Sequence, residues 1–600
     1  MTIGGGDGLD PSARAMVGDT ANAALVAADG TVDWWCPSRF DAPPLLTRLL
    51  EPAGACIRLG PHAPGRPPLG IQRYEPATLV LVTRLEGPES TVEVTDVMPW
   101  DGGGRNPHRL VRRLRVLRGP ADIAVDVVPG PGEVSVWSDG LAFGGTVVRC
   151  PVEFVSGSAP PPAPARPRRR QIVSGRVRLD TGAALVVTVD PPGAAGPPVS
   201  PDAAERLLTR TRSAWRRVVD AALVDGPFVD LAARSIVILR ALSDAGAPVS
   251  SPASSLPRLV GGERNTDGRV VRPVVAAAWA TAAAAAGLAE ESDAAVSWLA
   301  AAVEHEPPLP SALAPDASAP PTEAALTGLA GWRHSEPVVA GTNAPDRRTA
   351  EASAATVSVA AALGGELEPR WDRVIAHADW LADRWQDPDA TVWDLRGPAR
   401  PWVAPRLAAR DALVRAAATA RRRDPLDLDA AGWTVSVRAI EKGLLRDGLT
   451  SDGALRSAVE SGVAFEQWDV GVARAAWLGP WPPTEPVLRA TLARIASRNG
   501  DGPWVVPWPG DQDHGLPVDG LPGTEPPSVV ATLWLARALA LADQPDEAHE
   551  RIEAVAALGG AVGLLPESFD PRTGLALGNR PSAEAHVAFL EAVLTQGRRA

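Results

Sequence analysis

The spacing of apolar residues changes once along the chain. From about residue 16 to 200, apolar and polar residues alternate in short runs, with turn residues roughly every 8–12 positions. Alternation with period two is typical of half-buried strands. We predict strands over residues 78–85, 90–98, 108–117, 121–128 and 184–190. Many short strands separated by Gly/Pro turns indicate an antiparallel β-sandwich domain over residues 16–200.

From residue 201 onward, apolar residues recur three and four positions apart, which indicates amphipathic helices. Ser200-Pro201-Asp202 is typical of a helix start, and we predict a linker helix within residues 201–225. Further helices are predicted over residues 227–246, 273–289, 291–304, 350–363, 369–386, 405–422, 432–446, 461–477, 484–498, 527–542, 545–557 and 582–597. The chain is therefore expected to be a multidomain β + α protein. Its second domain, residues 226–600, is expected to be an (α/α)6 barrel, a toroid whose loops form a pocket at one end.

Composition and charge exclude several classes of function. The 600 residues exceed one ordinary core, which agrees with two domains. A net charge of −12 argues against nucleic acid or an anionic membrane as partner. No run of about 20 apolar residues predicts a transmembrane helix, and the N-terminus lacks the apolar region of a secretory signal. We therefore expect a cytoplasmic protein with neither a nucleic-acid nor a membrane partner.

Cysteine and histidine give no sign of a metal site. Cys36, Cys56 and Cys150 lack metal-ligand spacing, and the eight histidines form no close pair with a third ligand. The chain also has no nucleophile elbow, Walker loop or dinucleotide fingerprint. We therefore expect no metal and no cofactor.

Three segments of the predicted helical domain carry candidate chemistry. Near the C-terminus, GLLPESFDPRTGLALGNRPSAEAHVAFLEAVL (563–594) places one carboxylate, Glu567, after a short apolar run and before a Gly/Asn/Pro-rich turn. The other two segments are TVWDLRGPARPW (391–402), with Trp393, Asp394 and Arg396, and SSLPRLVGGERNTDGR (254–269), with Asp267 and Arg269.

These segments follow GDTANAALVAADGTVDWWCPSRFDAPP (18–44), with its Asp-Gly turn, Asp33-Trp34 and Arg39-Phe40-Asp41. In this order they resemble glycoside hydrolase family 15, the glucoamylases and bacterial trehalases, over most of the chain. The resemblance implies a β-sandwich followed by an (α/α)6 barrel. It also implies an inverting hydrolase of α-glucosides in carbohydrate metabolism, with a small sugar such as trehalose or a maltooligosaccharide as substrate.

The resemblance implies roles for two carboxylates. Glu567 falls on the general base, and Asp394 falls on the general acid, where the family has Glu. Inverting enzymes hold the two groups roughly 6.5–9.5 Å apart, which leaves room for a water. Aspartate is shorter by one methylene, roughly 1.5 Å. We therefore expect the pair at the same end of the barrel, near or slightly beyond that range.

The sugar-binding positions depart from the family. Trp393, Arg396, Asp267 and Arg269 are the substrate-binding residues that the resemblance implies. The family's Arg-Asn-Trp-Asp-Tyr-Arg run is here Arg-Asn-Thr-Asp-Gly-Arg (264–269), so both aromatic residues are missing. The Trp-x-Arg-Asp clamp that follows in the family is here Arg-Pro-Val-Val (272–275). We expect the two valines to make the pocket less polar than a glucose site.

Each candidate also has a reading without chemistry. Glu567 could cap a helix or lie on the surface, and Asp394 could be a loop residue paired with Arg396. Asp267 and Arg269 could form a structural ion pair, and Trp393 could pack against the barrel rim. Two functions therefore remain: a hydrolase of α-glucosides, or a catalytically impaired relative that serves as a binding or regulatory protein.

Overall fold

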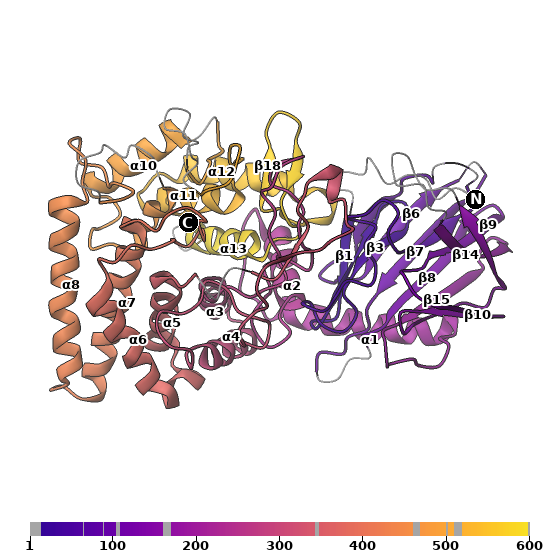
Figure 1. The fold of residues 1–600 in the computed structure, drawn as a ribbon, viewed down its shortest axis with the longest axis horizontal. Helices are drawn as coiled ribbons and strands as arrows, with labels where there is room; N and C mark the ends of the chain where they lie inside the picture. Colours follow the sequence, from indigo (N-terminus) through magenta and orange to yellow (C-terminus); the bar gives the residue numbers. More distant parts are fainter. Residues whose placement is uncertain are drawn as a thin grey trace.

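Strands precede helices in the computed structural model of the chain (Figure 1). It describes residues 14–597, except 64, 66, 88, 104–107, 160–169, 343–346, 460–468, 500, 501 and 509–518. The order expected from the sequence, antiparallel sheets followed by a helical domain, is confirmed. None of the helices in these residues is long and apolar enough to cross a membrane.

The N-terminal half consists of two antiparallel sheets packed face to face. One has the strand order β1 (Arg14–Gly18), β2 (Ala23–Ala27), β3 (Thr31–Trp35), β4 (Cys56–Pro61), β9 (Ala121–Val128), β14 (Arg170–Leu179), β13 (Phe154–Ala159). The other has the order β10 (Val134–Trp137), β11 (Gly140–Phe143), β12 (Thr146–Arg149), β15 (Ala184–Asp190), β8 (Leu110–Arg118), β7 (Thr91–Val97), β6 (Leu81–Glu86), β5 (Ile71–Tyr74). The five predicted strands correspond to β6, β7, β8, β9 and β15.

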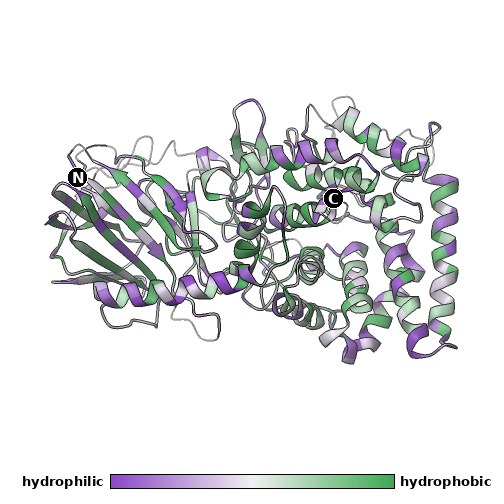
Figure 2. Cartoon of the chain, turned by 180° about the vertical axis from the view of Figure 1, so that it is seen from behind, coloured by the Kyte–Doolittle hydropathy of each residue, from purple (hydrophilic) through white to green (hydrophobic). Residues whose placement is uncertain are grey.

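Helix α1 (Pro201–Asp220) covers the outer face of the second sheet (Figure 1). Because side chains alternate along a strand, β8 sends Leu110 into the sandwich core and Val111 to the outer face, where it meets Leu208 of α1. The Ser200 side chain caps the helix by accepting a hydrogen bond from the Ala203 N–H at 3.2 Å. Figure 2 shows the banding of polar and apolar residues expected of a helix with one buried face.

The C-terminal half is a double ring of helices. The inner ring consists of α3 (Pro273–Ala285), α5 (Ala350–Leu363), α7 (Val403–Arg423), the 3-10 helix η5 (Val470–Arg474) with α9 (Ala475–Leu478), α11 (Val529–Leu541) and α13 (Ala583–Gly597). Each inner element contacts the next, and α13 closes the ring against α3. The outer helices are α2 (Val229–Ala241), α4 (Ala289–Ala302), α6 (Trp371–Arg384), α8 (Leu428–Asp447), α10 (Pro486–Asn499) and α12 (Pro545–Leu558).

Composition separates several inner helices from outer ones. Helices α3, α5 and α11 are rich in alanine and apolar on nearly all sides, because neighbours surround them. Helix α6 has one buried face and one polar face. The predicted helix over 461–477 lies partly outside the described residues, and its described part consists only of η5 and α9.

Short irregular segments complete the helical half. They are the 3-10 helices η2 (Trp332–His334), η4 (Gly365–Arg370) and η6 (Gly560–Val562), and two antiparallel strand pairs, β16 (Ala324–Ala325) with β17 (Val339–Ala340) and β18 (Ser568–Asp570) with β19 (Leu575–Leu577). The sequence did not predict these strands, because two or three residues are too few to establish a period.

The two halves meet at the segment that precedes α3. The Trp34 indole of β3 donates a hydrogen bond to the Pro252 carbonyl at 2.8 Å, and both Trp34 and its neighbour Trp35 are buried. The Arg269 guanidinium donates to the Ala42 carbonyl at 2.9 Å. The N-terminal domain therefore helps to position residues 250–270, several of which line a cavity of the helical domain.

Candidate active site

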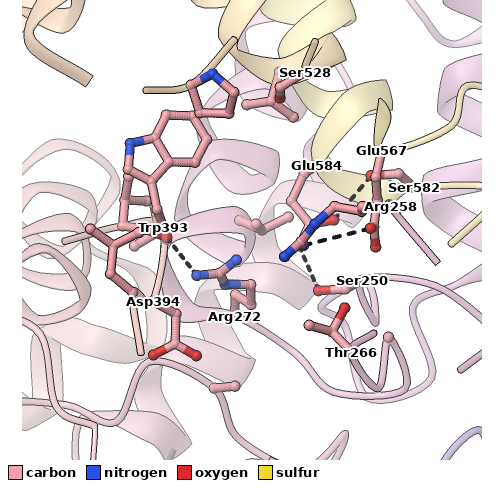
Figure 3. Close-up of a pocket in the computed structure, with 18 of the residues that line it drawn as sticks. Ser250, Arg258, Thr266, Arg272, Trp393, Asp394, Ser528, Glu567, Ser582 and Glu584 are labelled. Carbon is pink, nitrogen blue, oxygen red and sulfur yellow. Dashed lines mark hydrogen bonds and ion pairs between the residues drawn. The ribbon is translucent and has the colours of Figure 1, made fainter. Parts of the chain in front are cut away.

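A cavity of about 210 Å³ lies at one end of the helical ring, where loops join the inner helices (Figure 3). Its walls come from five stretches of sequence: the segment before α3 with the first turns of that helix, the loop before α5, residues 392–396, the region from 507 to α11, and the hairpin at Glu567 with the start of α13. Loops of this kind carry function because the surrounding scaffold holds them in place.

Glu567 lies in this cavity, immediately before β18. Its carboxylate accepts a hydrogen bond from Asn579 Nδ2 at 3.2 Å through Oε1, whereas Oε2 is buried without a hydrogen-bond partner among the described residues. Asn579 is fully buried and its side-chain Oδ1 accepts the Leu256 N–H at 3.2 Å, so the side-chain amide that holds Glu567 is itself held.

The backbone around Glu567 is fixed from both sides. The Val529 N–H at the start of α11 donates to the Glu567 carbonyl at 3.1 Å. His586 of α13 is buried, accepts the Leu565 N–H at 3.1 Å through Nε2, and contacts Ser235 Oγ at 2.9 Å through Nδ1. Burial lowers the pKa of His586 to about 3, so the ring is neutral and able to accept. The histidine therefore has a structural role in the segment that carries the carboxylate.

Gly578 gives the Glu567 side chain its space. The glycine follows β19, has a φ of +74°, and donates its N–H to the Pro257 carbonyl at 2.9 Å. A Cβ atom at this position would lie 2.4 Å from Glu567 Oε2 and 2.7 Å from Glu567 Cβ. Both the backbone conformation and the packing therefore require glycine here.

The pKa of Glu567 is raised to about 7, chiefly by burial and in smaller part by the nearby Glu584 carboxylate. The Arg258 guanidinium, 3.9 Å from Oε2, opposes both effects. A cavity carboxyl whose pKa is raised to about 7, with a charged group beside it, is a candidate for acid–base catalysis.

Asp394 lies in the same cavity, in a tight turn over residues 389–395. Its φ is +55°, which aspartate tolerates better than most residues, and its N–H donates to the Thr391 carbonyl at 3.1 Å. Arg347 donates to the carbonyls of Asp394, at 3.0 Å, and of Leu395, and its guanidinium is 3.9 Å from Asp394 Oδ1. That Oδ1 is buried and has no hydrogen-bond partner among the described residues.

Two buried carboxylates hold this turn from behind. Asp389 accepts the Thr391 N–H at 2.6 Å and the Ala350 N–H of α5 at 2.8 Å. Asp469 accepts the Trp393 indole N–H at 2.6 Å. Burial raises the pKa of Asp389 to about 7 and that of Asp469 to about 6. The turn that carries Asp394 is thus tied to the inner helical ring.

The structure brings most of the predicted site residues together. Glu567, Asp394, Trp393, Arg396 and Asp267 all line the cavity. In the view of Figure 3, Trp393 and Asp394 lie on one side, Glu567 lies on the other, and the guanidinium groups of Arg258 and Arg272 lie between them. Trp393 also packs against Trp508 and Trp534, with ring centroids 5.7 and 4.9 Å away.

Two of the predicted substrate-binding residues of the cavity already have protein partners. Arg396 forms a bidentate pair with Glu323, at 2.8 and 2.5 Å, rather than with Asp394. Asp267 accepts two hydrogen bonds from the Arg269 guanidinium, at 2.8 and 2.9 Å. Arg269 is not among the residues that line the cavity, because its guanidinium reaches towards the N-terminal domain.

Sequence reasoning missed a network of charged residues beside Glu567. Arg258 forms an ion pair with the Glu525 carboxylate at 2.9 Å, and Arg264 donates to Glu525 at 2.6 Å as well as to Asp519. Arg264 also donates to the carbonyls of Pro522, Leu521 and Gly523, which secures the loop before α11. The only sequence signal was the arginine-containing stretch 254–269, which does not reveal partners so far along the chain.

The position of the family's clamp lies in the cavity wall. Val274 and Val275, in the first turn of α3, line the cavity as the sequence predicted. Arg272, just before the helix, also lines it and donates to the Val392 carbonyl at 2.5 Å. In the part of the chain that the structure describes, no three His, Cys, Asp or Glu residues are arranged to hold a metal ion.

Comparisons with known proteins agree with this architecture. The family model Trehalase-like, N-terminal matches residues 5–143. The chain is 25% identical to a trehalase of Mycolicibacterium smegmatis, over 96% of this chain and 90% of that protein. It is 24% identical to a trehalase of Mycobacterium tuberculosis, over 97% of this chain and 88% of the relative.

A solved structure supports the fold over almost the whole chain. The crystal structure of a bacterial glucoamylase complexed with acarbose matches 99% of this chain and 96% of its own, with a TM-score of 0.67 and 12% sequence identity. At that identity the likeness concerns the fold, and it agrees with a β-sandwich followed by an (α/α)6 barrel. The trehalase-like N-terminal domain, the trehalase relatives and this fold all agree with the resemblance to glycoside hydrolase family 15 that the ordered motifs indicate.

Proposed function

We propose that this protein hydrolyses an α-glucoside with inversion at the anomeric carbon, with Glu567 as general base and Asp394 as general acid. One observation carries the proposal: both carboxylates line one cavity, and each keeps a buried oxygen without a hydrogen-bond partner among the described residues. A group that takes a proton from water, or gives one to a leaving oxygen, needs such an uncommitted oxygen.

Glu567 is suited to activate a water. Asn579 holds Oε1, which leaves Oε2 to accept the proton while the water attacks the anomeric carbon. The base must be ionised, and with a pKa of about 7 it becomes so as the pH rises through neutrality. The Arg258 guanidinium favours the ionised form, and Glu525 keeps that guanidinium in place.

In this proposal Asp394 protonates the departing oxygen. Hydrogen bonds to Asp389, Asp469 and Arg347 fix the backbone of the turn that carries Asp394. A fixed backbone matters here because the short aspartate side chain has little reach of its own. Protonation of the leaving oxygen contributes roughly 10²–10⁴-fold to rate in enzymes of known mechanism. The proposal requires a carboxyl separation within, or slightly beyond, the roughly 6.5–9.5 Å of inverting enzymes.

The first substrates to test follow from the relatives. Two full-length relatives are named trehalases, which supports trehalose, and the structural neighbour is a bacterial glucoamylase, which supports maltose and short maltooligosaccharides. The Trp393 face in the cavity is a suitable stacking surface for a sugar ring.

A second function, binding without turnover, is favoured by one observation. Val274 and Val275 line the cavity where the family has an Arg-Asp clamp. Each missing hydrogen bond to a buried sugar hydroxyl costs roughly 1–3 kcal/mol. A protein with this wall would bind glucose units weakly and orient them poorly, which fits a catalytically impaired binding or regulatory protein.

A hydrolysis assay with the purified full-length chain separates the two functions. We expect glucose release from trehalose, maltose or a maltooligosaccharide. By NMR, trehalose should first give equal amounts of β-glucose, from the attacked unit, and α-glucose, from the leaving unit, and the glucose cleaved from the non-reducing end of maltose should appear as the β-anomer. Glu567→Gln should abolish release, because an amide cannot accept the proton. The matched control is Glu553→Gln on the outer helix α12, an exposed residue whose substitution should leave the rate unchanged.

Two outcomes contradict the catalytic proposal. Initial release of α-glucose alone from trehalose would exclude inversion, and hydrolysis that survives in Glu567→Gln would exclude Glu567 as base. If no substrate is cleaved, the triple change Asp394→Glu, Val274→Arg and Val275→Asp tests whether the framework is still placed for chemistry. Activity gained by the triple variant would assign the impairment to these three side chains.

A further inference from the structure

Arg272 is the one cavity-lining arginine that has no carboxylate within 4.0 Å among the described residues. Arg258 pairs with Glu525, Arg396 pairs with Glu323, and Arg347 lies 3.9 Å from Asp394. The hydrogen bond that the structure gives to Arg272 joins its Nη2 to the Val392 carbonyl. The remaining guanidinium N–H groups are therefore available to a ligand.

Several apolar residues share the cavity wall with this cation. Val274 and Val275 follow it in the chain, Val392 accepts its hydrogen bond, and Val270 and Leu395 line the same cavity. A partly buried charge without a counter-ion is unfavourable in such surroundings. A ligand that brings the counter-charge into the cavity removes this cost, and the low dielectric constant strengthens the contact.

The same wall is unsuited to neutral hydroxyl groups. A hydroxyl both donates and accepts, and the Arg-Asp pair of the family offers both functions. In this chain the two clamp positions are valines, and the cation stands two residues earlier, at Arg272. Arginine only donates, and its planar N–H groups fit a carboxylate or a phosphate. The exchange replaces a hydroxyl-binding pair by an isolated cation.

We propose that Arg272, with the valine wall around it, binds an anionic substituent, a carboxylate or a phosphate monoester, on the sugar that enters this cavity. The inference deepens the proposed function and rests on it: the substrate is an α-glucoside that carries a negative charge. Arg272 is then the residue that selects charged over neutral glycosides.

The acidic residues of the cavity leave room for such a group. Asp394 is near the Arg347 guanidinium, and Glu584 accepts hydrogen bonds from Ser250 Oγ at 2.6 Å and Ser582 Oγ at 3.2 Å. Glu567, with a pKa of about 7, is partly protonated at neutral pH and has Arg258 beside it. The cation with no such partner is at Arg272, which places the anionic substituent at that wall.

Calorimetric titration of the full-length Glu567→Gln variant tests the preference without turnover. The ligands are trehalose, its 6-phosphate, the corresponding disaccharide with one glucuronic acid, and inorganic phosphate alone. We expect at least one charged disaccharide to bind about tenfold or more tighter than trehalose, with affinity that falls as salt is added. The two charged sugars distinguish a phosphate from a carboxylate.

Substitution of Arg272 in the Glu567→Gln variant tests whether this residue causes the preference for charged disaccharides. Arg272→Met should abolish the preference for the charged sugar, and Arg272→Lys should retain part of it, because lysine keeps the charge but loses the planar geometry. Arg438→Met on the outer helix α8 is the matched control, since Arg438 is exposed. The lysine variant keeps the test informative if the methionine variant does not fold.

Several outcomes would overturn the inference. They are equal affinity for charged and neutral disaccharides, a preference unchanged by Arg272→Met, or inorganic phosphate binding as tightly as the sugar phosphate. Failure of the proposed function looks different: charged sugars would bind through Arg272, yet wild-type protein would hydrolyse none of them. Glu567-dependent hydrolysis of neutral glycosides, with no charge preference, would refute only the inference about Arg272.

Discussion

Replacing Glu567 by glutamine should stabilise the folded protein, and more so at high pH. The folded structure raises the pKa of this carboxyl from 4.5 to about 7, chiefly through burial. A raised carboxyl pKa means that the folded state binds the proton more tightly than the unfolded state. This stabilising contribution is complete below pH 4.5 and is lost as the pH rises through about 7. Glutamine carries no charge at any pH and avoids the loss.

The magnitude follows from the two pKa values. One pKa unit corresponds to about 1.4 kcal/mol, so ionising Glu567 in the folded protein costs roughly 3 kcal/mol relative to the unfolded chain. Glutamine can keep the hydrogen bond from Asn579, because its carbonyl oxygen can occupy the place of Oε1. For a cooperative unit of several hundred residues, about 3 kcal/mol corresponds to about 4 °C in melting temperature.

The assay compares thermal unfolding of wild type and Glu567→Gln at pH 5 and pH 8. Other buried carboxyls, such as Asp389 and Asp469, titrate in both proteins and cancel in the difference. We expect the advantage of the variant to grow by up to about 4 °C between the two pH values. For the exposed control Glu553→Gln, the difference in melting temperature from wild type should be the same at both pH values. A difference that is constant with pH, or that favours the wild type at pH 8, would refute the assigned environment of Glu567.

Three other substitutions test how the site is held. Arg258→Met should move the acidic limb of the kcat/KM profile up by about one pH unit, because the guanidinium lowers the pKa of Glu567; an unmoved limb would contradict this. Gly578→Ala should lower kcat about 100-fold by displacing the Glu567 side chain, while unfolding stays cooperative; full activity would show that the clash is relieved elsewhere. Asp469→Leu should lower kcat about tenfold and alter tryptophan fluorescence by freeing the Trp393 indole, whereas Asp469→Asn should retain most activity; equal losses in both variants would rule out the hydrogen bond as the cause.

Much of the fold was predictable because its signals are local. Helix α5 begins and ends at the residues that the periodicity predicted, and β9 and β15 also match their predicted bounds. The helix start at Ser200 was also predictable, because the capping hydrogen bond joins its side chain to the N–H of Ala203, only three residues away. The short strands β18 and β19 were missed, although they form the hairpin that follows Glu567.

Only the residues of the candidate site that lie within recognisable motifs could be predicted from the sequence. The segments around Glu567 and Asp394 were recognisable by their residues, and the structure places both in one cavity. The roles of Arg258 and Glu525 were not recognisable, because charges at distant positions carry no pairing information in a single sequence. Arg396 illustrates the limit: pairing with Asp394 was one interpretation of the sequence, but the structure pairs Arg396 with Glu323.

The sequence by itself determined which segments are strands and helices, where the pattern changes from one to the other, and which residues could carry acid–base chemistry. These properties depend on backbone geometry and side-chain spacing over a few residues. The tertiary structure alone decided which cavity arginines pair with carboxylates and that Arg272 has none within 4.0 Å among the described residues, and it alone gave Glu567 its raised pKa. Those properties arise when the ring of helices closes and brings distant loops together, because burial and charge pairing depend on distance in space rather than along the chain.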